Sequence, residues 1–477
     1  MTLDVLIKNA IVITMEGSGV GIIDDGAVGI IGNLIEVVGR TEDVLNNYKA
    51  HRYIDATNKV VMPGLIDAHI HTGIGLLRGV AQDIYNWMQQ GMWPFEDQIR
   101  QDTDAVMAGS LMNIVEALKA GTTTFCDFDY PMGEIVKNHH RLGTRACVAE
   151  LISEFPRDLS DVQVGDLYPL DSAIGNQKLA NNLRLIEDWH EKDNGRITCM
   201  LGPQGPDMVS TEMLRVVADY SQKLDMTIHM HVSQGQREIT QMMKRYGKRS
   251  IQYLDELNYL NPSLLAVHLT TATPEEAHVV AKSGAGMVLC SGSIGIINGV
   301  VPPAFEFMEY SNRLALGSDQ APGNNCNNMF NEMKFTSILN KCKRQDPTVF
   351  PAWKVLRMAT IESARAIGKG EEIGSLRKGK KADLIIVDMM EPCVAPIIKY
   401  PVRNIIPNLV YSAKGSEVET VIIDGQFIVE GHKVLGLDEK EVITKAMTAA
   451  KRVCDKADVS FRKQKTALQE MMENNCL

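Results

Sequence analysis

The sequence predicts an α/β protein in which a (β/α)8 TIM barrel carries a small β-sandwich domain built from both ends of the chain. Three observations predict this fold class. The middle of the chain alternates eight short β-branched runs with amphipathic segments, strand-like runs flank it on both sides, and ligand-type side chains end several strands. Strand–helix alternation indicates a parallel sheet, and eight such units indicate a closed barrel.

Segments near both ends predict the small β domain. Short apolar runs bounded by turn residues are typical of strands. They occur at Val5–Asn9, Ile11–Met15, Ala27–Ile31, Ile35–Gly39, Tyr53–Asp55, Ala382–Asp388 and Val418–Val429. Asp424 and Gly425 lie between two apolar runs and indicate a hairpin. We therefore assign residues 1–60 and 373–438 to the small domain, 61–372 to the barrel, and 439–477 to a polar C-terminal helix or tail.

Eight barrel strands are expected, separated by segments with apolar residues at helical spacing. The strands are Leu65–His71, Thr122–Phe128, Arg145–Ile152, Ile197–Leu201, Met226–Val232, Leu264–Leu269, Gly286–Cys290 and Leu314–Asp319. Helical spacing is clear in Asp102–Ala120, Ser210–Lys223 and Pro274–Ser283. The uncharged stretch Ser283–Phe305 is long enough to span a bilayer, but its glycines and paired prolines predict a barrel strand followed by a loop.

Composition and charge exclude several classes of protein. The 477 residues are 45% hydrophobic and 23% charged, and the net charge of -10 argues against nucleic acid binding, which requires a basic surface. The nine cysteines form no C-x-x-C pair and indicate reduced thiols of a cytoplasmic protein. No basic segment followed by an apolar one opens the chain, so we predict no signal peptide and no membrane contact.

Ligand-type side chains end four of the predicted strands, where barrel enzymes carry their functional groups. They are His69 and His71 on the first strand, His229 and His231 on the fifth, His268 on the sixth and Asp319 on the eighth. His69 and His71 face the same side with Cβ atoms roughly 6–7 Å apart, so they can share a divalent ion. A buried His or Asp without a partner costs on the order of a few kcal/mol, and one metal ion satisfies all of them. The other histidines, predicted to lie at the surface, are His51, His139, His140, His190, His278 and His432.

Several segments spread along the chain match motifs of a known superfamily. They are Pro63–His71, Leu76–Gly79, Trp87, Trp93–Glu96, Gly317–Asp319, Asn327–Phe330, Met358–Thr360, Ile373–Leu376 and Gly379–Ile385. Through them the chain resembles the amidohydrolase superfamily nearly end to end. It looks most similar to the aminohydrolase branch, which contains methylthioadenosine/S-adenosylhomocysteine deaminases, guanine and melamine deaminases and triazine chlorohydrolases.

The resemblance implies a site with one divalent metal ion. Its ligands are implied to be His69, His71, His231 and Asp319. By spacing alone His229 is an alternative to His231, which we choose because the family motif places the metal ligand last in the pair. The ion lowers the pKa of bound water from about 16 to about 7; Asp319 would act as general base and His268 would hold or polarise the substrate. Zinc suits these ligands, and so does iron(II).

Departures from the family pattern bear on the substrate. Gln234 stands where the family carries a proton-donating Glu, and an amide cannot deliver a proton, so Glu238 or Glu96 are candidates to supply it. Gln204 and Asp207 stand where the nucleoside deaminases carry a His and a Tyr, which weakens a methylthioadenosine assignment. Gln234 is still counted among the catalytic residues. Substrate contacts are implied for Trp87, Glu96, Gln204 and His268.

The predicted function is hydrolytic deamination of an amino- or imino-substituted nitrogen heterocycle. Alternatives are hydrolysis of a cyclic amide, triazine-type dechlorination, and a non-catalytic metal-containing scaffold, which Gln234 suggests. Gln320 and Gly323 replace the Asn and Ser of the chlorohydrolases and argue against dehalogenation. We expect a small heterocyclic substrate and a homo-oligomer, either a dimer or a tetramer.

Overall fold

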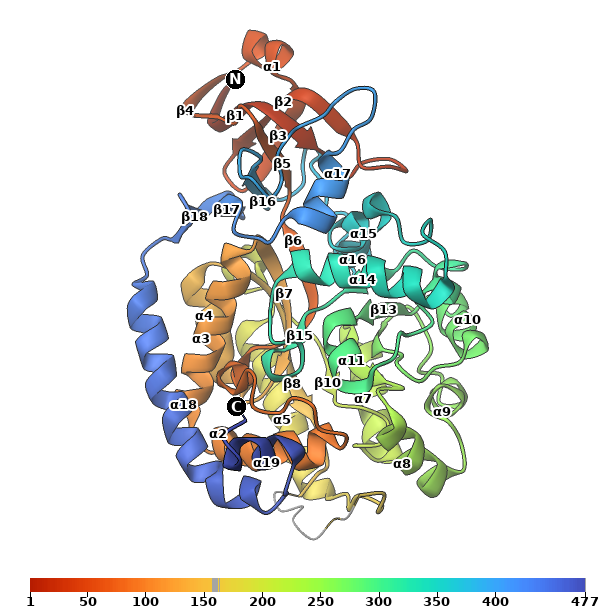
Figure 1. The fold of residues 1–477 in the computed structure, drawn as a ribbon. Coiled ribbons are helices and arrows are strands. Elements are labelled where there is room, and N and C mark those ends of the chain that lie inside the picture. Colours follow the sequence, from red (N-terminus) through yellow and green to blue (C-terminus); the bar gives the residue numbers. More distant parts are fainter. Residues whose placement is uncertain (157–161, 163, 477) are drawn as a thin grey trace.

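The computed structural model describes residues 1–156, 162 and 164–476. A β layer built from both ends of the chain lies at one end of the molecule, at the top of Figure 1. Strands and helices alternate in the rest of the chain, so the protein has a mixed α/β fold. Among the described residues, no helix is long and apolar enough to cross a membrane.

The β layer is one hydrogen-bonded sheet of nine strands. They are β1 (Thr2–Ile13), β2 (Ile22–Ile31), β3 (Leu34–Arg40), β4 (Lys49–Asp55), β5 (Lys59–Pro63), β16 (Leu384–Asp388), β17 (Val418–Ile423), β18 (Gln426–Glu430) and β19 (Lys433–Val434). Their order is β19-β18-β17-β16-β5-β1-β2-β3, with β4 also paired to β1. The two ends of the chain meet where Leu384 of β16 lies opposite Pro63 of β5.

Two predictions within this sheet have different outcomes. The hairpin at Asp424 and Gly425 is confirmed, because both residues have positive φ (51° and 77°) between β17 and β18. The separate runs Val5–Asn9 and Ile11–Met15 are instead joined in β1, which ends at Ile13. A register irregularity near Asn9, where φ is 61°, allows the strand to continue.

Two parallel sheets form the body of the molecule. The first contains β6 (Leu65–His71), β7 (Thr122–Asp129), β8 (Arg145–Ile152), β9 (Ile197–Cys199), β10 (Gly202–Pro203) and β15 (Asp319–Gln320), and the second contains β11 (Ile228–Val232), β12 (Leu264–His268), β13 (Gly286–Leu289) and β14 (Leu314–Leu316). A single bridge joins Leu201 to Ile228 on one side, and β14 leads through Gly317 and Ser318 into β15 on the other. Each of the eight predicted strands has a counterpart. The fourth is shortened to β9, with β10 following it, and the eighth is divided into β14 and β15.

The strands of the body are buried along their length. Every residue of β6, β7 and β8 is buried, as expected for parallel strands covered by helices.

Helices follow most of these strands along the chain. α3, for example, begins after Asp102, whose carboxylate accepts a hydrogen bond from the Ala105 N–H. The helices are α1 (Thr41–Asn47), η1 (Thr72–Leu77), η2 (Trp87–Met92), α2 (Trp93–Arg100), α3 (Thr103–Lys119), α4 (Met132–Leu142), α5 (Ser172–Trp189), α6 (Lys192–Gly195), α7 (Thr211–Leu224), α8 (Gln236–Tyr246), α9 (Ser250–Glu256), α10 (Pro274–Lys282), α11 (Ser291–Asn298), α12 (Ala304–Met308), α13 (Ala321–Asn324), α14 (Met329–Arg344), α15 (Ala352–Met358), α16 (Ile361–Ala366), α17 (Ile405–Pro407), η3 (Asn408–Ser412), α18 (Glu439–Arg462) and α19 (Ala467–Glu473).

The stretch Ser283–Phe305 departs from the prediction beyond its strand. Where a loop was expected, residues Ser291–Asn298 form α11, which ends at Gly299 with a φ of 63°. A Cβ at Gly292 would lie 2.4 Å from Oδ1 of Asn324. This glycine therefore reflects close packing of α11 and does not interrupt the helix.

The C-terminal segment is helical, as predicted. α18 runs along the outside of the body, at the left of Figure 1, and packs against α2 and α3. One face of the helix is buried through a row of small residues: Val442, Ala446, Ala449, Val453 and Ala457. Because these side chains are short, α18 can approach α3 closely.

Candidate active site

Four strand ends bring the predicted ligand-type side chains together. They come from β6 (His69 and His71), β11 (His229 and His231), β12 (His268) and β15 (Asp319), and none is more than 6% exposed. Side chains two positions apart on a strand point to the same side, so each His-x-His pair directs both rings inward. The sequence therefore predicted correctly that these groups meet.

The interatomic distances define the centre of the cluster. Nε2 of His231 lies 3.2 Å from Nε2 of His69 and 3.4 Å from Nε2 of His71. Oδ1 of Asp319 lies 3.5 Å from Nε2 of each of these first-strand histidines. Ligand atoms of His69, His71 and Asp319, and also those of His69, His231 and His268, all fall within 4.8 Å of one another. One cation can thus be reached by side chains from several strands.

The second nitrogen of each ring is held by a neighbour. Nδ1 of His71 is hydrogen-bonded to the Phe128 carbonyl, and Nδ1 of His231 lies 2.7 Å from the Gln204 carbonyl. His69 Nδ1 lies 2.8 Å from His229 Nε2. These contacts orient three Nε2 atoms toward one point. They also distinguish the fifth-strand pair, since His229 supports His69 while His231 faces the centre.

The unpartnered polar atoms at this point fit a cation. Oδ1 of Asp319 and both ring nitrogens of His268 are buried without a hydrogen-bond partner among the described residues. Leaving such groups unsatisfied costs about 1–3 kcal/mol each. The other carboxylate oxygen of Asp319 accepts a hydrogen bond of 2.5 Å from Ser293 Oγ, so Oδ1 is the oxygen directed at the histidines. Imidazoles and a carboxylate are donors that a divalent transition metal prefers.

Burial controls the protonation of the cluster. It lowers the pKa of His69 to about 3 and that of His268 to about 4, and it lowers the pKa values of His229 and His231 as well. Burial raises the pKa of Asp319, but its interactions with His69, 3.5 Å away, and with the other neighbouring imidazoles outweigh this effect and leave the pKa well below its usual value. These four imidazoles are thus held neutral beside an ionised carboxylate, and these are the forms that bind metal ions.

The backbone is strained at two of these residues. Asp319 and His268 have positive φ values of 60° and 79°, which side chains with a Cβ rarely adopt. The strand end at Asp319 is held by Asn327, whose Nδ2 donates to the Asp319 carbonyl at 3.1 Å and to Ser318 Oγ at 2.7 Å. Ser318 in turn donates through its N–H to buried Asp67 at 2.9 Å. This network keeps the carboxylate in a conformation that it would not adopt alone.

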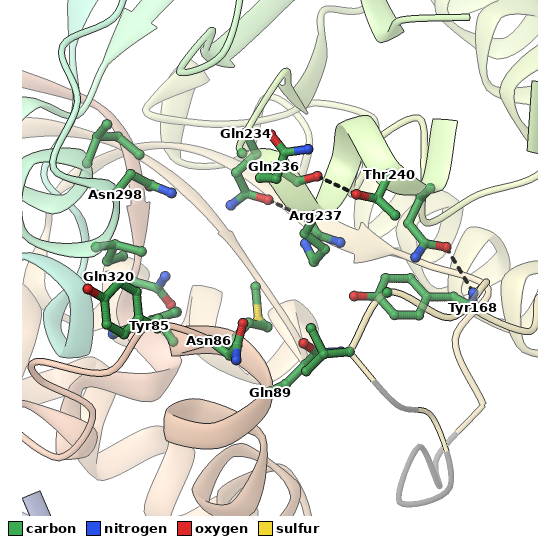
Figure 2. Close-up of a pocket in the computed structure, with 18 of the residues that line it drawn as sticks. Tyr85, Asn86, Gln89, Tyr168, Gln234, Gln236, Arg237, Thr240, Asn298 and Gln320 are labelled. Carbon is green, nitrogen blue, oxygen red and sulfur yellow. Dashed lines mark hydrogen bonds between the residues drawn. The ribbon is translucent and has the colours of Figure 1, made fainter. Parts of the chain in front are cut away.

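Figure 2 shows a cavity, with a volume of about 250 Å³. Asp319 is among its lining residues. Its lining residues are Tyr85, Asn86, Trp87, Met88, Gln89, Val164, Gly165, Tyr168, Gln234, Gly235, Gln236, Arg237, Thr240, Gln241, Ile294, Ile297, Asn298, Asp319 and Gln320. Of the predicted substrate contacts and catalytic groups, Trp87 and Gln234 line this cavity together with Asp319. His268 belongs to the buried histidine cluster and does not line the cavity.

Two predicted substrate contacts have other partners. Glu96 is paired with Arg100 at 3.2 Å on α2 and is not among the residues that line the cavity. Gln204 contributes its backbone carbonyl, which holds His231, and is also outside the lining. Glu238, considered as a proton donor, accepts hydrogen bonds from the N–H groups of Ser233 and Gln234, at 2.7 Å each, and caps this turn.

One predicted surface histidine is buried. His139 lies on the inner face of α4, where Nδ1 is 2.8 Å from Thr144 Oγ1 and Nε2 is 3.1 Å from Asp127 Oδ2. Asp127 also accepts a hydrogen bond from the Thr72 N–H, directly after His71. The surface prediction was therefore wrong, because helical surroundings do not tell which face of the helix a residue occupies.

Sequence reasoning missed two residues of the site, Ser293 and Arg237. Ser293 lies on α11, in the stretch predicted as a loop, so no pattern indicated its contact with Asp319. Arg237 follows Gln234 by three positions at the start of α8 and donates to its side chain. Because Gln234 lies before α8, the spacing rule for helical pairs did not apply, and no sequence pattern indicated this contact.

These features define a class of protein. Parallel strands whose carboxyl ends carry converging imidazoles and a carboxylate, beneath an open cavity, are typical of metal-dependent hydrolases. The chain belongs to the amidohydrolase family, whose family model matches residues 60–428. The predicted resemblance is confirmed, and with it a hydrolytic enzyme that acts on carbon–nitrogen bonds.

Two related deaminases match nearly the whole chain. A 5-methylthioadenosine/S-adenosylhomocysteine deaminase of Thermoanaerobacter pseudethanolicus is 31% identical over 453 residues, covering 94% of this chain and 99% of the relative. A 5'-deoxyadenosine deaminase of Methanosarcina acetivorans is 33% identical over 465 residues, covering 95% and 99%. The deaminase branch predicted from the motifs is thus the branch of these relatives.

Solved structures agree with this relationship. An adenosine deaminase from Xanthomonas campestris with bound zinc has a TM-score of 0.85 at 28% identity and covers 95% of this chain and 99% of its own. An atrazine chlorohydrolase from Arthrobacter aurescens, complexed with zinc, has a TM-score of 0.82 at 19% identity and covers 94% and 100%. The second comparison shows similarity of fold alone.

Proposed function

We propose that this protein hydrolytically deaminates an amino- or imino-substituted nitrogen heterocycle, releasing ammonia. One observation carries the proposal. The Nε2 atoms of His69, His71 and His231 converge with Oδ1 of Asp319 at the end of an open cavity, in a chain that matches named deaminases over nearly its full length. Replacement of the amino nitrogen by oxygen requires water, a base and a proton for the leaving group.

His69, His71, His231 and Asp319 are the proposed ligands of one divalent ion. Zinc is favoured by the donor set and by the zinc in the similar adenosine deaminase, and iron(II) suits the same donors. When bound, such an ion supplies Lewis acidity and lowers the pKa of water to about 7.

The chain's own residues would provide the proton transfers. Asp319 is the only carboxylate among the described residues that line the cavity. We assign it the role of general base, taking a proton from the attacking water through Oδ1 and passing it to the leaving nitrogen. Ser293 keeps Oδ2 occupied, so one oxygen is reserved for this task. Neutral His268 has unpartnered ring nitrogens and can donate one hydrogen bond to the charge that develops on the substrate.

We also propose finer features of the fold. The two parallel sheets close into the (β/α)8 barrel of residues 61–372, supported by the bridge at Leu201 and the continuity from β14 into β15. The terminal sheet is the small β-sandwich domain of residues 1–60 and 373–438, followed by the C-terminal segment 439–477. A homo-oligomer, a cytoplasmic location and the absence of nucleic acid and membrane partners stay predictions from the sequence.

A screen for ammonia release tests the function. Protein loaded with zinc, and in parallel with iron(II), is incubated with adenosine-type nucleosides, purine bases, pterins, triazines and creatinine-like rings. We expect ammonia from at least one heterocycle with the wild type and none above background with Asp319→Asn prepared identically. Halide or a ring-opened product would instead indicate the alternative hydrolases. Silence across the whole panel, or equal ammonia from the variant, would contradict the proposal and favour a scaffold.

A further inference from the structure

The side chain of Gln234 is held by Arg237 on the wall of the cavity. We propose that Arg237 is a positioning residue that keeps the Gln234 carboxamide with its NH2 group toward the substrate. The enzyme would thereby select heterocycles that present a hydrogen-bond acceptor there, either a ring nitrogen or an oxo group. The inference rests on the proposed function, because it names the feature of the heterocycle that the cavity reads.

The contact between the two residues determines which way the amide faces. Nη2 of Arg237 lies 2.9 Å from Oε1 of Gln234. A guanidinium has only donors, so an amide turned the other way would set one N–H group against another. Nε2 of Gln234 therefore points away from Arg237, and in Figure 2 it faces the side of the pocket where Asn298 and Gln320 lie. Among the described residues none accepts a hydrogen bond from it.

Both residues are fixed in turn. Nη1 of Arg237 lies 2.6 Å from Oδ2 of Asp207, whose side chain is only 1% exposed. The backbone N–H of Gln234 donates to Glu238 at 2.7 Å. Because Asp207 balances the charge of Arg237, the pair adds no net charge to the cavity. The wall thus offers the uncharged NH2 group of Gln234 as a hydrogen-bond donor, which suits an uncharged acceptor on the substrate.

This arrangement connects two departures from the family pattern. Asp207 stands where the nucleoside deaminases have a Tyr and Gln234 where the family usually has a Glu, and Arg237 contacts both of them. A glutamate at position 234 would face the guanidinium and be held ionised, so it could not donate a proton. The amide keeps its hydrogen-bond donor beside the same arginine.

Selectivity for the acceptor is tested by binding of unreactive analogues of the heterocycle found in the ammonia screen. One pair differs by a ring nitrogen replaced with C–H, and another by an oxo group replaced with hydrogen. We expect the wild type to prefer the acceptor in one pair by about tenfold in Kd, and Gln234→Leu to lose that preference. The pair that responds identifies the acceptor. Arg237→Met should lose most of the preference, and Arg237→Lys, which also only donates, should keep part of it.

A matched control is Arg249→Met. Arg249 forms a similar ion pair, 2.6 Å from Glu276, but does not line the cavity. Its variant should retain the wild-type preference. If Arg237→Met does not fold, because Asp207 is then buried without a partner, the double variant Asp207→Asn/Arg237→Met replaces it. Retention of the full preference by Gln234→Leu would overturn the proposal.

A second measurement needs no substrate and separates this proposal from the proposed function. In Gln234→Glu, pairing with Arg237 should lower the pKa of the new carboxylate below its unfolded value of about 4.3. The added stability is then present above that value and is lost as pH falls through the folded pKa. We expect the Tm difference between Gln234→Glu and wild type to be larger at pH 7 than at pH 4, and this rise to vanish with Arg237→Met. An identical difference at both pH values would show that the contact is absent.

Discussion

The floor of the pocket and its wall are built from different kinds of structure. By the floor we mean the buried cluster of imidazoles on strand ends, which reaches the cavity through Asp319. Its members are held by neighbouring groups, with the exception of His268. The wall at Gln234 and Arg237 lies on the turn after β11 and the start of α8, and its order depends on side chains contacting one another. A floor on rigid strands suits chemistry that needs fixed geometry, and a wall on a turn can change with the substrate.

Substituting Asp319→Asn should have the largest effect on the floor. An amide cannot accept the proton from water and is a weaker ligand, so turnover should fall by about 10³-fold or more. The hydrogen bond from Ser293 can persist, and the Tm of the metal-free protein should change little. Steady-state rates with metal content measured on the same sample check this. A variant that keeps a tenth of the activity at full metal occupancy would remove Asp319 from the mechanism.

His268→Asn should produce the next largest effect. The ring of His268 is buried with no partner for either nitrogen among the described residues, which leaves it able to donate the hydrogen bond to the substrate that we propose for it. Loss of one such donor typically lowers kcat about 10²- to 10³-fold. Metal content should stay at the wild-type level, which separates a substrate role from a ligand role. Loss of metal together with activity would place His268 among the ligands.

The pair on β11 sharpens the comparison within the floor. His229→Gln removes the support of His69 and should weaken metal affinity about 10- to 100-fold. His231→Gln removes a proposed ligand and should weaken it further. Competition with a chelator of known affinity measures both variants under the same conditions. The reverse order would mean that His229 is the ligand.

Trp87→Phe tests the wall and should have the smallest effect. Trp87 lines the cavity, and its buried indole N–H has no hydrogen-bond partner among the described residues, so the smaller ring loses contact area and no hydrogen bond. Contact area acts on ground state and transition state alike, so KM should rise about three- to tenfold with kcat nearly unchanged. The two constants measured with the best substrate of the screen check this. A fall in kcat of a hundredfold would give Trp87 a role in the chemistry.

Prediction from the sequence succeeded where the two-residue period of a β-strand determines which way side chains point. The period of two on β6 and β11 placed both His-x-His pairs on one side of their strands, and their position at strand ends brought the ligand-type side chains together. Prediction failed where the packing of a helix decides. Gly292 sits inside α11, where a loop was expected, and His139 faces inward on α4, because neighbours distant in sequence occupy the space around them.

By itself, the sequence determined the family, through its motifs, and the succession of strands along the chain. It also determined which residue types meet at the floor, because strand geometry repeats every two residues whatever surrounds it. The family motif favoured His231 over His229, but only the tertiary structure showed that His229 contacts His69 and that Glu238 is occupied by backbone N–H groups. It also brought Asp207, Arg237 and Gln234 into contact. Such contacts depend on where separate segments pack in space, and a linear pattern does not encode that.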